Sequence, residues 1–167
     1  MKRLKLAIAI GLALFGVWRV YGTQASGCAP IVRLWERGDS TLVPEIPNTI
    51  ARSIAIGNPA DGAFAAKVKR ESGGGGQHVS DEALVAGIRL LAETTGVFTE
   101  TAGGVTVAGA VALAEAGHFH SDDEVVLCIT GNGLKTTEAV SDVLTPAPVI
   151  APKVRDVAAL VAERTGS

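Results

Sequence analysis

The residues best placed to do chemistry lie at positions 124–140, "EVVLCITGNGLKTTEAV", where an apolar run leads into a tight glycine turn. The run "EVVLCIT" is continuously apolar after its first residue, which predicts a strand that is buried on both faces. Open α/β sheets bind their ligands beyond the carboxyl ends of the strands. The turn is therefore a candidate ligand site, with the hydroxyl of Thr130 at its lip.

The spacing in this turn does not match either common phosphate-binding motif. A P-loop would need a glycine at Cys128, and Lys135 follows a leucine where the motif has a glycine. A dinucleotide-binding turn would need a third glycine beyond Gly131 and Gly133, and a long helix that does not follow before Ser141. The residues alone thus predict a site and leave its ligand open.

A second glycine-rich stretch, "ESGGGGQHVSD" at positions 71–81, is another candidate site for a bound anion. A glycine loop before a helix can point several N–H groups at a phosphate. However, no strand is expected to enter it, because a helix ends at Ser72. Four consecutive glycines are typical of a flexible connector, and that is the prediction for this stretch.

Short strand-like stretches alternate with longer helical ones along the chain. The best-marked helix, at positions 80–96, has Ser80 as its N-cap and Asp81 and Glu82 at the positive end of its dipole. The sequence also predicts strands at 20–24, 96–100 and 124–130, and helices at 28–38 (stopping at Gly38), 63–72, 102–117 and 154–164. The alternation predicts an α/β fold with an open parallel sheet covered by helices.

Composition narrows the class of partner. With 47% hydrophobic and 19% charged residues in 167, the chain belongs to the globular class. A formal net charge of -2 and 4% aromatic residues argue against nucleic acid as a partner. Cys28 and Cys128 stand alone in apolar contexts, so we expect reduced thiols in the core and neither a redox pair nor a metal site.

The first residues, "MKRLKLAIAIGLALFGVW", have a basic start and an apolar run at 6–18. This is the pattern of a secretory signal peptide, and the run is too short to span a bilayer. It also has helical spacing, and cleavage after Ala25 would cut through a stretch that reads as structured. We therefore expect an apolar helix over 1–19 in a cytoplasmic protein without a membrane partner, with export as the alternative.

Four stretches carry a resemblance to a known family: "GTQASGCAPIVRLWERG", "PNTIARSIAIGNPADG", "VSDEALVAGIRLLAETTGVFTETAGGVTVAG" and "VVLCITGNGLKTTEAV". Together they resemble the C-terminal part of threonine synthase, a pyridoxal-phosphate enzyme of the tryptophan-synthase-β-like fold. The resemblance implies that residues 20–167 form the C-terminal part of a catalytic domain. It further implies pyridoxal 5'-phosphate as cofactor and the conversion of O-phosphohomoserine and water to threonine and phosphate.

The resemblance also implies two cofactor-binding residues. The threonine of the family's "TGNGLK" motif, here Thr130, places its hydroxyl at the pyridine nitrogen, and the alternative is a residue that merely closes a strand. Glu100 in "FTETAGG" matches a position near the cofactor, with a capping or surface carboxylate as the alternative. Many relatives read Glu-Pro-Ala at this place, where this chain has Thr101.

The family joins its cofactor to a lysine in a Ser-Phe-Lys-Asp-like stretch, and no lysine of this chain has that context. We therefore expect a truncated or split copy that is inactive alone, with no catalytic residue of its own and a separately encoded N-terminal half as partner. A homo-oligomer is a further expectation. The alternative is a non-catalytic remnant or an exported α/β binding domain.

Overall fold

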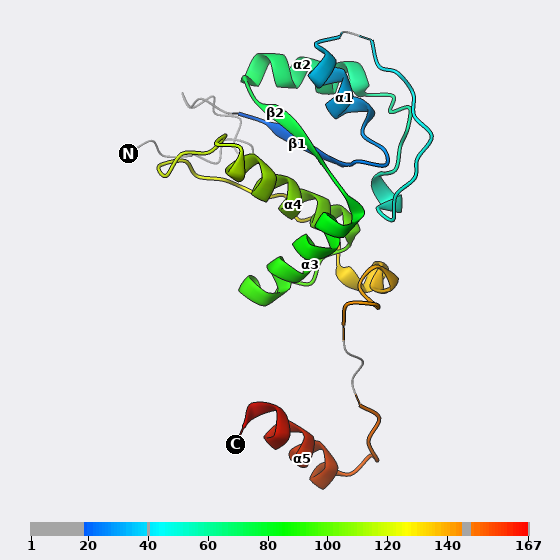
Figure 1. Ribbon diagram of the computed structural model, residues 1–167, viewed down its shortest axis with the longest axis vertical. Coiled ribbons are helices and arrows are strands. Elements are labelled where there is room, and N and C mark those ends of the chain that lie inside the picture. Colours follow the sequence, from blue (N-terminus) through cyan, green and yellow to red (C-terminus); the bar gives the residue numbers. More distant parts are fainter. Residues whose placement is uncertain (1–18, 40, 145–147, 167) are drawn as a thin grey trace, which may run out of the picture.

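The computed structural model describes residues 19–39, 41–144 and 148–166, and it has an α/β architecture (Figure 1). The helix or signal predicted at 6–18 lies outside these residues. The elements in chain order are β1 (Tyr21–Ala25), α1 (Pro30–Arg37), η1 (Arg52–Ile54), α2 (Gly62–Ser72), β2 (Gly75–Val79), α3 (Asp81–Thr95), α4 (Thr101–Glu115), η2 (Gly133–Lys135), η3 (Thr137–Ala139) and α5 (Val154–Thr165).

Helices cover both faces of a parallel sheet, which confirms the predicted fold class. The described sheet consists of β1 and β2, paired in parallel. Helices α1 and α2 lie on one side of it, α4 lies on the other, and α3 packs on α4 (Figure 1). Among the described helices, none combines the length and the apolar character needed to cross a bilayer.

The glycine-rich stretch 73–76 is not the connector that the sequence predicts. Gly73 ends α2 in the left-handed conformation, and the strand β2 then starts at Gly75. Gly76 pairs with Gly22 of β1 under the indole of Trp35, and a Cβ at Gly76 would lie 2.2 Å from a Trp35 ring carbon. Glycine is needed here because it lets α1 approach the sheet closely, and flexibility plays no part.

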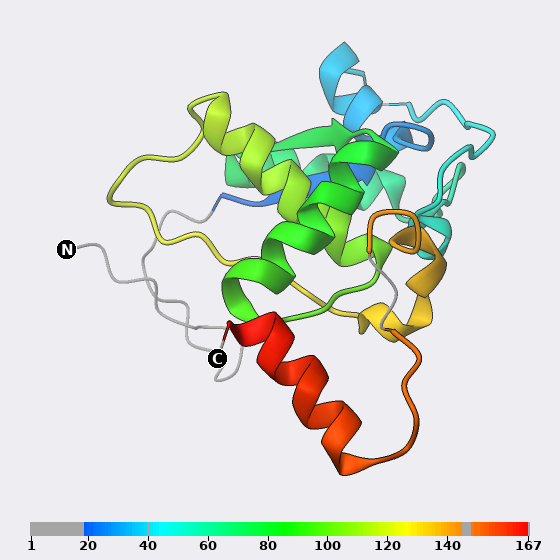
Figure 2. The same ribbon diagram turned by 60° about the horizontal axis from the view of Figure 1, so that its bottom comes forward.

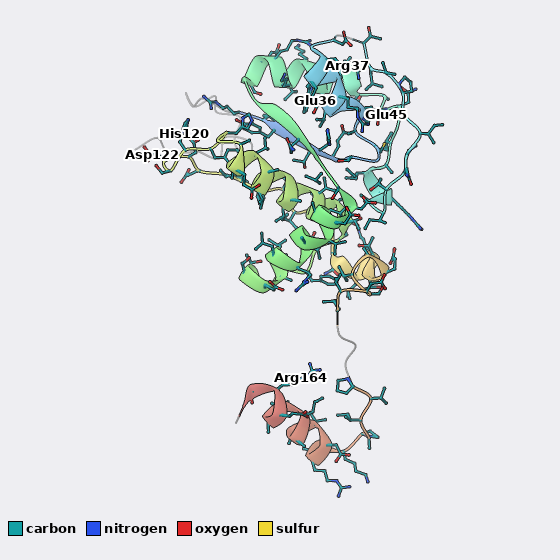
Figure 3. The ribbon with its side chains drawn as sticks, viewed as in Figure 1. Glu36, Arg37, Glu45, His120, Asp122 and Arg164 are labelled. Carbon is teal, nitrogen blue, oxygen red and sulfur yellow. The ribbon has the colours of Figure 1, made fainter. Side chains whose placement is uncertain are left out.

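The N-terminus of α1 is capped by side chains from elsewhere in the chain. The Gln24 Oε1 atom accepts hydrogen bonds from the N–H groups of Ile31 and Val32, each at 3.0 Å. The Glu45 carboxylate accepts from the Ala29 N–H at 2.9 Å and from Arg33 (Figure 3). These side chains satisfy the N–H groups that the first turn of a helix leaves free.

The same contacts set the pKa of Glu45. Burial alone raises the pKa of this carboxyl. The hydrogen bonds from Arg33 and from the Ala29 N–H, together with the positive charges of Arg33 and Arg37, lower it by more, so the pKa lies below its ordinary value. Glu45 is therefore held as a carboxylate at the start of α1, where a negative charge interacts favourably with the helix dipole.

Helices α3 and α4 cross at glycines. Ser80 caps α3 as predicted, because its Oγ atom accepts from the Ala83 N–H at 3.2 Å. Where the helices cross, a Cβ at Gly104 would lie 2.5 Å from the Leu84 carbonyl oxygen, and one at Gly87 would lie 2.6 Å from the Gly104 carbonyl oxygen. The predicted tight packing of the small-residue helix is confirmed. The core around this crossing contains Ala25, Ala51, Val79, Leu84, Ile88, Val105, Ala108 and Val140.

Two predicted strands are wrong. Residues 124–130 form no strand, and the side chains of Val125, Val126 and Leu127 are 48%, 69% and 37% exposed. In the stretch 96–100 only Thr99 pairs, in a single antiparallel bridge with Asn132. Apolar β-branched residues form a buried strand only beside a paired neighbour, and neither β1 nor β2 offers one to these residues.

The C-terminal helix α5 forms as predicted. It runs from Val154 to Thr165 and buries none of its side chains. Figure 1 shows it well away from the sheet and its covering helices. It therefore contributes little to the core that positions the turn at 130–136.

The two adjacent glycines of β2 give a test of this packing. We expect Gly76→Ala to lower the free energy of unfolding by about 1–3 kcal/mol, because the new methyl group overpacks against Trp35. A Cβ at Gly75 would meet Tyr21 at an ordinary 3.5 Å, so Gly75→Ala should change stability by less than about 1 kcal/mol. Urea unfolding followed by circular dichroism measures both. Equal losses of stability for the two variants would show that contact with Trp35 is not what requires glycine at position 76.

Candidate functional site

The turn that follows residues 124–130 is fastened to the start of α4. The Gly131 carbonyl oxygen accepts hydrogen bonds from the Glu100 N–H at 3.1 Å and from the Thr99 Oγ1 atom at 3.0 Å. The Gly133 N–H donates to the Phe98 carbonyl oxygen at 3.0 Å. In Figures 1 and 2 the short helices η2 and η3 accordingly lie beside the end of α4 at which that helix begins.

The turn also caps α4. Glu100 occupies the N-cap position, but its side chain makes no capping hydrogen bond. Instead the Thr136 Oγ1 atom accepts from the Thr101 N–H at 3.2 Å. A proline at position 101 would carry no N–H and would need no such partner, whereas Thr101 does. The hydroxyl of Thr136 thus satisfies a donor that Thr101 introduces, and the sequence analysis missed this residue.

The carboxylate of Glu100 lies directly against the turn. The residue is only 8% exposed, and its Oε2 atom lies 3.8 Å from the Lys135 Nζ atom. A Cβ at Gly131 would lie 1.9 Å from Glu100 Oε1, so glycine is required there by close approach. Of the alternatives for Glu100, a surface carboxylate and a side-chain cap are both excluded. Its role toward a cofactor stays a prediction.

Thr130 presents a free hydroxyl at the lip of the turn. Its side chain is exposed and makes no hydrogen bond with any other described residue. The neighbouring Gly131 lies against Glu100, so the structure brings the two predicted site residues together around one peptide group. A hydroxyl in this position can donate to, or accept from, a ligand atom that approaches the turn.

A second polar atom of the site has no partner. The Thr101 Oγ1 atom is buried, the residue is 0% exposed, and the atom makes no hydrogen bond within the described chain. Among the described residues no group of three or more His, Cys, Asp or Glu side chains is placed to hold a metal ion. The two unpaired polar groups, the hydroxyls of Thr130 and Thr101, are neutral, and a neutral hydroxyl can donate to a neutral ring nitrogen.

The capping role of Thr136 predicts a measurable loss of stability. Thr136→Val keeps the side-chain volume and removes the acceptor, so the Thr101 N–H is left buried and unpaired. We expect the free energy of unfolding to fall by about 1–3 kcal/mol in urea titrations. The matched control is Thr137→Val, at an exposed residue whose hydroxyl makes no described hydrogen bond, which should change it by less than about 0.5 kcal/mol. If Thr136→Val left the free energy of unfolding unchanged, the turn would not be held through this hydroxyl.

Comparisons with known proteins agree on one family. The model of the family "pyridoxal-phosphate dependent enzyme" matches residues 4–131. The threonine synthase of Bacillus sp. (strain ULM1) is 40% identical over 117 residues, which are 70% of this chain and 31% of that protein. The threonine synthase of Methanosarcina acetivorans is 38% identical over 126 residues, which are 75% of this chain and 31% of that protein.

A solved structure shows the same fold. The maize serine racemase structure superposes with a TM-score of 0.50 at 22% identity, covering 62% of this chain and 31% of that one. The chain therefore spans about a third of the length of the relatives that it matches. Because the family model matches well over half of its residues, this chain belongs to the pyridoxal-phosphate dependent enzyme family.

Proposed function

We propose that residues 20–167 are the C-terminal part of the catalytic domain of a threonine synthase. The reaction is the conversion of O-phosphohomoserine and water to threonine and phosphate, a lyase step of threonine biosynthesis in the cytoplasm. The observation that carries the proposal is the turn at 130–136, fastened to α4 with the Thr130 hydroxyl unpaired at its lip. The threonine synthases that are 38–40% identical to the chain support it.

Thr130 is the residue that we assign to the cofactor ring. Pyridoxal phosphate, when bound, supplies the ring that delocalises negative charge from the substrate. The Thr130 hydroxyl would donate a hydrogen bond to the ring nitrogen, and as a neutral group it would not force a proton onto that atom. Its exposed, unpaired state leaves it available for this bond.

Glu100 is the second residue assigned to the cofactor side, and it acts through the turn. Its carboxylate fills the space beside Gly131, next to Thr130, and pairs with Lys135. A negative charge at the start of the 15-residue helix α4 is favoured by the helix dipole. Glu100 would thus fix the position of the turn, and with it the position of the Thr130 hydroxyl.

The rest of the active site is assigned to a partner. The chain spans 31% of the length of the relatives above, and none of its lysines lies in a Ser-Phe-Lys-Asp-like context. We assign the lysine, the site for the cofactor phosphate and most of the substrate contacts to a separately encoded N-terminal half. The completed enzyme would then assemble as a homo-oligomer.

The isolated chain should form no threonine from O-phosphohomoserine, because none of its lysines lies in the Ser-Phe-Lys-Asp-like stretch that the family resemblance requires. Co-expression with the part of the Methanosarcina acetivorans threonine synthase that precedes the matched region should restore phosphate release. Threonine formation by the chain alone, with a borohydride-trapped cofactor on one of its own lysines, would contradict the proposal. So would a complex that forms and remains inactive.

Thr130→Val tests the assignment of the ring contact in the assembled complex. Loss of one hydrogen bond, worth about 0.5–1.5 kcal/mol, should weaken pyridoxal-phosphate binding by about 2–13-fold in absorbance titrations, and turnover should fall with it. Gly75→Ala is the control, because Gly75 belongs to the other glycine-rich stretch and has room for a methyl group. A larger loss for Gly75→Ala would mean that the ligand binds at the glycine-rich stretch 73–76 and that its assignment to the turn at 130–136 is wrong.

A further inference from the structure

A serine and a histidine meet at the carboxyl ends of β1 and β2, beside a glutamate of α1. The Ser26 Oγ atom lies 2.9 Å from the His78 Nδ1 atom, and the His78 Nε2 atom lies 3.5 Å from Glu36 Oε1. We call these three residues the serine cluster, and the proposed function uses none of them. A hydroxyl within hydrogen-bond distance of a base, with a third group behind the base, is the arrangement of an activated nucleophile.

His78 lies on the face of β2 that α1 covers. Alternate residues of a strand face the same side of a sheet, so His78 is on the same side as Gly76. Trp35 of α1 packs on Gly76, and the next residue of that helix is Glu36, which Figure 3 labels. The side chain of His78 is 35% exposed and that of Glu36 is 54% exposed, so small reagents in solution have access to the cluster.

Ser26 lies in a tight turn between β1 and α1. The Cys28 N–H donates to the Ala25 carbonyl oxygen at 2.9 Å, which puts Ser26 and Gly27 at the centre of the turn. The Ser26 N–H donates to the Val79 carbonyl oxygen at 2.7 Å, so the turn is held to β2. The order strand, serine, helix is also that of the nucleophile in α/β-hydrolases, although their Gly-x-Ser-x-Gly motif is absent here.

The backbone supplies a hydrogen-bond donor beside the serine hydroxyl. The Gly27 N–H, which directly follows Ser26, makes no hydrogen bond with any other described residue. The N–H after a nucleophilic serine is a donor that can hold the negative oxygen formed when the serine attacks a carbonyl group. The turn is also held from α1, because Arg33 Nη2 donates to the Ser26 carbonyl oxygen at 2.7 Å and Arg33 is paired with Glu45.

We propose that the serine cluster is a second nucleophilic site, at which Ser26 takes an acyl group from a carboxylic ester and passes it to water. The Ser26 Oγ atom attacks the ester carbonyl carbon and gives its proton to His78 Nδ1, while the Gly27 N–H donates to the oxygen that becomes negative. When the bond to the alcohol breaks, the alcohol takes that proton. Water then attacks the acyl-serine with His78 again as base, which releases a carboxylic acid and restores Ser26.

Glu36 acts on this step through His78. For Nδ1 to accept the serine proton, the neutral ring must carry its hydrogen on Nε2, the nitrogen that faces Glu36. The separation of 3.5 Å is longer than a good hydrogen bond, so Glu36 contributes mainly its charge, which stabilises the imidazolium formed during the attack. Glu36 is therefore a positioning residue, and its effect is small because both side chains are partly exposed.

The first test treats the isolated chain with a fluorophosphonate, whose phosphorus atom is attacked by activated serines with loss of fluoride. We expect mass spectrometry to find the label on Ser26, and Ser26→Ala to abolish it. The internal comparison is Ser121, an exposed serine whose hydroxyl is bonded to Asp122 at 3.0 Å, and it should stay unlabelled. Absence of the label from Ser26, or equal labelling of Ser121, would overturn the proposal.

The role of the base is tested at His78. A general base contributes about 100-fold or more, so His78→Gln should slow the labelling of Ser26 by at least about 100-fold. In His78→Ala, added imidazole should restore part of the rate, which a histidine that only ties β1 to β2 would not show. The control is His120→Gln, at an exposed histidine outside the cluster, and its labelling should not change. Fast labelling in His78→Gln, or no rescue of His78→Ala, would overturn the proposal.

The positioning role of Glu36 has its own readout. Glu36→Gln should slow the labelling by less than about fivefold, the loss expected for a partly exposed ion pair. Salt at about 1 M screens charges beyond about 3 Å, so the difference between this variant and the unchanged chain should disappear there. A loss that persists in high salt would overturn the role of Glu36 as a charge.

The full reaction is measured with p-nitrophenyl acetate. The isolated chain should release about one equivalent of p-nitrophenolate in a burst as the acyl-serine forms, followed by slower steady hydrolysis. The burst should be lost in Ser26→Ala and kept in His120→Gln. Labelling of Ser26 without any burst would overturn acyl transfer as the reaction of the site. These assays use neither pyridoxal phosphate nor O-phosphohomoserine, so their outcome is independent of the proposed function.

Discussion

The close fit of α4 between the sheet and α3 is the constraint on which the other features depend. Glycines make this fit possible, because a Cβ at Gly109 would lie 2.2 Å from Thr23 of β1 and one at Gly104 would lie 2.5 Å from the Leu84 carbonyl oxygen of α3. Protein interiors are close-packed, so a helix of small residues can bring two layers nearer than larger side chains would allow. The position of α4 along the sheet is therefore narrowly defined.

Helix α4 determines the geometry of the candidate site. The turn at 130–136 makes its hydrogen bonds to the residues just before α4 and to the first N–H of α4 itself. Gly131 then lets the buried Glu100 carboxylate lie beside the peptide that follows Thr130. A hydroxyl with the role proposed for Thr130 needs a rigid support, since its side chain makes no hydrogen bond with any other described residue.

Residues 125–129, in contrast, are not held in place by pairing with a strand. Parallel sheets are usually covered by helices on both faces, and here the sheet of β1 and β2 is accompanied by the apolar residues 125–129, which pair with neither strand. The well-packed α3–α4 layer and the unpaired segment meet at the turn. The candidate site thus lies between the well-packed α3–α4 layer and residues 125–129, which make no hydrogen bond with any other described residue.

Local signals in the sequence determined much of the result. The cap at Ser80, the left-handed stop at Gly38 and the small-residue pattern of 102–117 predicted α3, α1 and α4, because capping and helical periodicity depend on residues within a few positions. The motifs likewise predicted the family and Thr130 as the candidate residue. The tertiary structure alone decided that Gly75 and Gly76 begin a strand, that residues 125–129 do not form one, and that Glu100 is buried against Gly131. Strand pairing and burial depend on neighbours that are distant in the chain, and no local pattern specifies whether those neighbours are present.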